Sequence, residues 1–160
     1  MKKKLLVAVW YYLPAAAWVG LIFSVSTGSF SADATGGVME RLLRAAWPGF
    51  LARLNETELW LLNVAARKAA HLTEYAVLAF LAWRAGARGR SERARAALRG
   101  ALAFAIGCAV LDEAHQSLYA NRTSAAADVL LDICGAALSV AAIRRRERRH
   151  AKCPTSVSLS

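Results

Sequence analysis

Three stretches of the chain carry ionisable residues at helical spacing within otherwise apolar sequence. The first holds Lys68, His71 and Tyr75 at positions i, i+3 and i+7, with Glu74 beside them. Residues at these intervals lie on one face of an α-helix. Histidine beside a carboxylate is suited to general acid–base chemistry, and a lysine could bind a phosphate or a carboxylate.

The second and third stretches repeat this design further along the chain. The second combines acidic, histidine and amide side chains on one helical face and its border: Asp112, Glu113, His115 and Gln116. The third places Asp128 and Asp132 four residues apart, with Gly135 on the same stripe, where it would allow a neighbouring helix to approach closely. Arg122 lies between the two stretches and could pair with one of their carboxylates.

Together these residues form the predicted functional site, with two kinds of role. The candidates for proton transfer or catalysis are His71, Glu74, Asp112, Glu113, His115, Asp128 and Asp132. The candidates for binding a ligand are Lys68, Tyr75, Gln116 and Arg122.

Long apolar helices are needed to position these groups. The chain is 57% hydrophobic and 20% charged, and its charges lie in blocks between apolar runs, which is typical of a membrane protein. We expect an all-α bundle of four transmembrane helices in a single domain over 1–152, with a disordered cytoplasmic tail over 153–160. The expected spans are 5–25, 63–83, 97–118 and 125–143.

The first apolar run has a second interpretation. Lys2, Lys3 and Lys4 precede it and small residues follow it, as in a signal peptide. The run is longer than the usual apolar core of such a signal, which is about 7–15 residues. We therefore favour a retained helix.

Lysine and arginine gather at the N-terminus, between the second and third spans, and after the fourth. Because cytoplasmic segments are enriched in these residues, we expect both termini in the cytoplasm of a bacterium and the protein in its inner membrane. The polar site then faces outward. In the extracytoplasmic loop, Val38, Leu42 and Ala45 are compatible with a short surface helix, and Asn55 with Glu58 resembles a cap that starts the second helix near Glu56.

Several other interpretations are less well supported. The net charge of +10 comes from the segments that set topology, which also could touch anionic lipid, so we do not expect nucleic-acid binding. The three cysteines form no CxxC pair and are expected to be small buried packing residues. Since no HExxH-like spacing, nucleophile elbow or phosphate-binding loop occurs, we predict neither a metal nor a cofactor.

The polar motifs resemble the VanZ-like family of bacterial membrane proteins. The resemblance rests on Lys68-x-x-His71-x-x-x-Tyr75, on Asp112-Glu113-x-His115-Gln116, and on Arg122, Asp128 and Gly135. The chain departs from the family where Asp132 replaces a usual Asn, which adds a charge. The founding member is linked to low-level teicoplanin resistance, so the resemblance implies a multi-pass protein acting at the cell envelope.

Three functions remain open at this point. The leading hypothesis is that the outward-facing site binds, and also could modify, an envelope lipid headgroup or a peptidoglycan-related molecule. The alternative is a structural or accessory subunit of an envelope complex, without catalysis. A proton-coupled transporter is less well supported, because four spans are few and the charges lie toward one side rather than at the midplane.

Overall fold

The computed structural model describes residues 2–26, 41, 45–51, 53–118 and 126–152. Its regular secondary structure in this part of the chain is entirely helical, which confirms the all-α prediction. The helices are α1 (Lys2–Val25), α3 (Pro48–Leu51), α4 (Glu56–Ala87), α5 (Ser91–Gln116) and α6 (Ala126–Lys152). The surface helix expected around Val38 and the tail over 153–160 lie outside the described residues.

Three of these helices are long and apolar enough to cross a membrane: α1 over Leu5–Val25, α5 over Glu92–Gln116, and α6 over Ala126–Arg149. Helix α4 has 32 residues but is not among them. Its first half carries charged residues, which lowers its mean hydropathy. The described part of the chain therefore contains three candidate spans, and the fourth predicted span is not confirmed.

Helix α4 begins where its sequence predicts. The Asn55 side chain accepts a hydrogen bond from the Glu58 backbone N–H, and the Glu58 carboxylate accepts one from the Asn55 N–H, each at 2.9 Å. This capping box satisfies two N–H groups that the first turn of a helix leaves unpaired. At the other end the chain reverses through Arg88 and Gly89, both with positive φ, and enters α5.

The four long helices extend beyond their predicted spans, most clearly at the start of α5 and at the end of α6. Helix α5 begins at Ser91 rather than near residue 97, because Ala94 and Leu98 pack in the interior beside the turn from α4. Helix α6 continues to Lys152, well past residue 143 where the apolar run stops. Arginine is a good helix former, so the helix continues through the arginine-rich segment beyond the apolar run.

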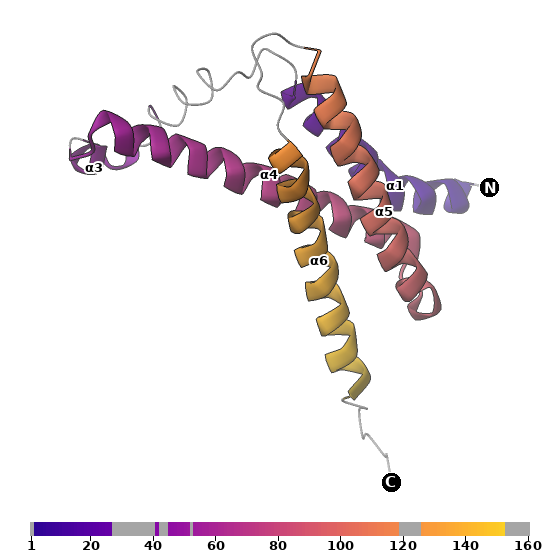
Figure 1. Ribbon diagram of the computed structural model, residues 1–160. Helices are drawn as coiled ribbons and strands as arrows, with labels where there is room; N and C mark the ends of the chain where they lie inside the picture. The colour runs from indigo at the N-terminus through magenta and orange to yellow at the C-terminus, as the bar shows by residue number, and fades with distance from the viewer. Residues whose placement is uncertain (1, 27–40, 42–44, 52, 119–125, 153–160) are drawn as a thin grey trace.

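Helices α4, α5 and α6 pack around a small core to which α1 adds one side (Figure 1). Tyr75 and Leu78 of α4 are its largest buried side chains, and alanines of α5 and α6 surround them. Alanine allows helix backbones to approach closely. Large apolar side chains such as Leu6, Leu111 and Leu138 remain exposed, as expected of helices that face lipid.

Helix α1 is attached to α4 mainly through aromatic side chains. The Trp18 indole N–H donates to the backbone carbonyl of Glu74 at 3.0 Å. The Arg84 guanidinium lies 5.3 Å from the ring centres of Trp10 and Tyr11, within the range of cation–π attraction. These contacts fix α1 at two levels along α4.

The closest approach between helices occurs where Gly135 of α6 meets Leu72 of α4. A Cβ atom added at Gly135 would overlap the Leu72 carbonyl oxygen and would lie 2.9 Å from the Leu72 carbonyl carbon. Because both obstacles are backbone atoms, no side-chain movement could make room. The predicted role of Gly135 in close helix approach is confirmed.

We predict that Gly135→Ala separates α4 from α6 and destabilises the protein by about 1–3 kcal/mol, as overpacking does elsewhere. The midpoint of thermal unfolding in detergent would fall accordingly. Gly107→Ala is the matched control, because an added Cβ at this α5 glycine meets nothing within 4 Å. Equal midpoints for the two variants would contradict the prediction.

Candidate functional site

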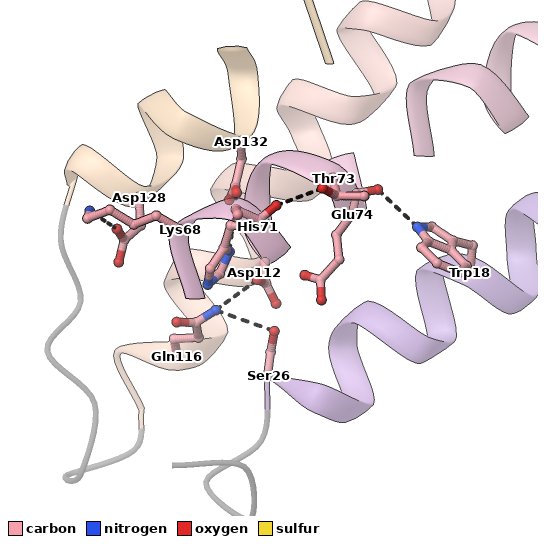
Figure 2. Close-up of polar contacts among 11 residues, drawn as sticks. Trp18, Ser26, Lys68, His71, Thr73, Glu74, Asp112, Gln116, Asp128 and Asp132 are labelled. Carbon is pink, nitrogen blue, oxygen red and sulfur yellow. Dashed lines mark hydrogen bonds and ion pairs between the residues drawn. The ribbon is translucent and has the colours of Figure 1, made fainter. Parts of the chain in front are cut away.

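Predicted site residues from three helices, among them His71, Asp112 and Asp132, converge where α4, α5 and α6 meet the end of α1 (Figure 2). We call this group the polar cluster, and it comprises Ser26, Lys68, His71, Tyr75, Asp112, Gln116, Asp128 and Asp132. Five of its members are buried: Ser26, Tyr75, Asp112, Gln116 and Asp132. The helical stripes seen in the sequence therefore face one another, as the cost of placing ionisable groups in lipid requires.

Asp112 is the most deeply buried carboxylate of the cluster, with 1% of its surface exposed. Its Oδ2 accepts a hydrogen bond from the Gln116 amide at 2.8 Å, and the same amide donates to the Ser26 hydroxyl at 3.3 Å. Its Oδ1 is buried and has no hydrogen-bond partner in the described part of the chain. A buried carboxylate that accepts one hydrogen bond from a neutral amide leaves most of its desolvation cost uncompensated.

His71 of α4 faces Asp132 of α6. The His71 Nδ1 and Asp132 Oδ1 atoms lie 3.2 Å apart, with 12% and 4% of the two side chains exposed. The atoms are close but not aligned as a hydrogen bond. A neutral imidazole with its proton on Nδ1, toward Asp132, would keep Nε2 available to accept a proton.

Lys68 and Asp128 form a second contact between α4 and α6, one turn toward the beginning of each helix. Lys68 Nζ lies 3.5 Å from Asp128 Oδ1 at the edge of the cluster (Figure 2). The Lys68 side chain is 52% exposed, so the pair adds little stability where water reaches it. The exposed ammonium group remains accessible to a ligand that approaches from this edge.

Tyr75 is fully buried on α4, one helical turn beyond His71. Its hydroxyl lies within electrostatic range of Asp112 and Asp132 and has no hydrogen-bond partner among the described residues. A buried hydroxyl without a partner costs about 1–3 kcal/mol of desolvation. Both Tyr75 and Asp112 therefore hold unused hydrogen-bonding capacity in the same interior region.

Three further candidates lie around the cluster. Glu74 and Glu113 are half-buried, and the Glu113 Oε1 atom is buried without a hydrogen-bond partner in the described segments. His115 is half-buried, and its ring lies 5.9 Å from that of Phe23 in a tilted arrangement. Arg122 lies outside the described residues, so its predicted pairing stays a prediction.

Ser26 and Trp18 are polar partners that the sequence did not single out. Ser26 binds Gln116, and Trp18 binds the α4 backbone beside the cluster. A serine at the end of an apolar run carries no distinctive signal. The cysteine prediction is confirmed for Cys108, which is buried, and wrong for Cys134, which is exposed on α6. Cys153 lies outside the described residues.

The polar cluster is rich in hydrogen-bond acceptors and contains one imidazole, that of His71, which can exchange a proton. Within the polar cluster the carboxylates of Asp112, Asp128 and Asp132 outnumber the basic groups of Lys68 and His71. The cluster therefore best complements a ligand that donates hydrogen bonds, such as an ammonium or hydroxyl-bearing group. In the described part of the chain no three histidine, cysteine or acidic side chains come together as a metal site.

Comparison with known proteins agrees with the motifs. The VanZ/LLP1 family model matches residues 9–146, which include the polar cluster and most of every long helix. No curated protein and no solved structure gives a significant match. The resemblance inferred from the motifs is confirmed: the chain is a member of the VanZ/LLP1 family.

Proposed function

We propose that the polar cluster binds the polar part of an envelope molecule or lipid headgroup through groups that donate hydrogen bonds to Asp112 and Tyr75. The observation that carries this proposal is their unused hydrogen-bonding capacity inside the protein. A ligand that supplied these bonds would offset the desolvation cost of the two buried groups. Exposed Lys68 supports an entry from the edge of the cluster.

The same site has the elements for modifying its ligand. Asp132 can orient the His71 imidazole, which then exchanges a proton with a bound hydroxyl or amine. His71 is the residue we assign to proton transfer, and Asp132 is its positioning partner. A link to teicoplanin resistance is a separate part of the proposal, which a susceptibility assay of cells with and without the protein would test.

We further propose that α4 is the fourth membrane span, with the cluster outward and both termini cytoplasmic in the bacterial inner membrane. The supporting argument is that α6 partners the polar groups of α4. The contacts of Lys68 with Asp128 and of His71 with Asp132 lower the cost of inserting them. The mean hydropathy of α4 does not take these contacts into account, because it counts each side chain without its partner.

The span number can be tested from the two termini, because four spans place them on one side and three spans on opposite sides. We expect fluorescent-protein fusions at either end to fluoresce, and alkaline phosphatase fusions at either end to be inactive. An alkaline phosphatase fusion to the segment before Glu56 serves as the positive control. Opposite behaviour of the two termini would refute the four-span arrangement.

The Tyr75→Phe variant distinguishes a role of Tyr75 in ligand binding from a role in stability, because the two effects are expected to have opposite signs. Removing an unpartnered buried hydroxyl should raise the free energy of unfolding by about 1 kcal/mol. If the hydroxyl serves a ligand, the same variant should bind more weakly despite its greater stability. We would measure the thermal midpoint of purified protein with and without a lipid-linked peptidoglycan precursor, and with phosphatidylethanolamine as a second probe.

The Asp112→Asn variant should bind about tenfold or more weakly to whichever of the two lipid probes the wild-type protein binds. The reason is that hydrogen bonds to a charged group contribute about 1.5–3 kcal/mol. Thr73→Ala is the matched control, because the Thr73 hydroxyl donates to the Ala69 carbonyl of its own helix and, among the described residues, to no group of the cluster. If neither Tyr75→Phe nor Asp112→Asn changed binding or phenotype while both folded, the binding proposal would fail. A phenotype that followed stability alone would favour the alternative, a structural or accessory subunit.

A further inference from the structure

Two adjoining hollows lie between α5 and α6, at the end of these helices that is far from the polar cluster. Their volumes are about 820 and 430 Å³, and they share a wall made by Leu102, Val140, Arg144 and Arg148. Arg99 of the larger hollow and Asp112 of the cluster are 13 residues apart on α5, which corresponds to about 20 Å along a helix. The two regions are therefore separate sites.

The rim of the larger hollow is strongly cationic. Arg95 and Arg99 of α5 face Arg144 and Arg148 of α6 across it. Glu147 is the acidic residue of this lining, yet none of the four guanidinium groups makes an ion pair or hydrogen bond with another described residue. Like charges gathered from two helices repel one another, and an anion between them would relieve that repulsion.

The floor of the hollows is apolar. Leu98 and Leu102 of α5 and Val140 of α6 lie one turn from the arginines, toward the middle of the two candidate spans. Ala137 and Ala141 extend the apolar wall in the smaller hollow. The groove thus presents charge at its mouth and hydrocarbon within, in the order in which a phospholipid presents its headgroup and acyl chains.

We propose that this arginine-rimmed groove binds an anionic phospholipid, with the phosphate between Arg99 and Arg144 and an acyl chain along Leu102 and Val140. Arginine suits this role because its guanidinium group can donate two parallel hydrogen bonds to one phosphate. A soluble anion would satisfy the rim but leave the apolar floor unfilled. The proposal does not depend on what the polar cluster binds.

The test uses full-length protein, delipidated in neutral detergent and titrated with phosphatidylglycerol or phosphatidylcholine of identical acyl chains. Native mass spectrometry measures bound lipid. Wild-type protein should prefer phosphatidylglycerol, and Arg144→Gln should weaken that binding about fivefold, the loss expected for one basic residue near an anionic lipid. Arg99→Gln with Arg144→Gln should weaken it further.

Arg146→Gln is the matched control. It removes the same charge from the same exposed part of α6, and Arg146 lines neither hollow. It should change the affinity by less than about twofold. Equal losses for Arg144→Gln and Arg146→Gln would overturn the groove in favour of unspecific attraction. Displacement of the lipid by equimolar glycerol 3-phosphate would overturn the lipid occupant in favour of a soluble anion.

Discussion

The contact between the backbones of α4 and α6 at Gly135 is the constraint on which the rest of the polar cluster depends. Because Gly135 has no Cβ, α6 lies directly against the Leu72 carbonyl. This approach brings Asp132 to His71 and Asp128 to Lys68, on the turns of α6 that precede the glycine. A larger residue at position 135 would move both carboxylates away from their partners. The two electrostatic contacts at this helix crossing therefore depend on the same close backbone packing.

Helices α5 and α6 carry groups of opposite charge at their two ends. One end gathers carboxylates in the protein interior, where burial makes each unsatisfied oxygen costly. The other end spreads arginines around an open groove, where water can solvate their charge. The apolar alanine-rich core between them keeps the two sets of charges apart. This separation explains how a chain with a large positive net charge maintains an acceptor-rich interior.

Much of the cluster could be predicted because the bilayer penalises misplaced charge. Helical spacing identified Asp112, Gln116 and Asp132 as inward-facing, and their burial follows from that penalty. The pairing of particular residues could not be predicted, since the register of α4 against α6 depends on how small residues pack. Hydrophobicity located the α6 span but not its end, which arginine helix propensity sets. Whether the polar half of α4 enters the membrane also depends on the α6 residues that contact it. The sequence of α4 alone does not identify those residues.

The hydrogen bond between Gln116 and Ser26 connects the polar cluster to the end of α1. One amide group holds the Asp112 carboxylate with one hydrogen atom and the Ser26 hydroxyl with the other. Its bond to Ser26, at 3.3 Å, is the longer and weaker of the two. Loss of this weaker bond would leave the Gln116 amide bound to Asp112 alone, so a displacement of Ser26 at the end of α1 changes the hydrogen bonding around the buried carboxylate of α5.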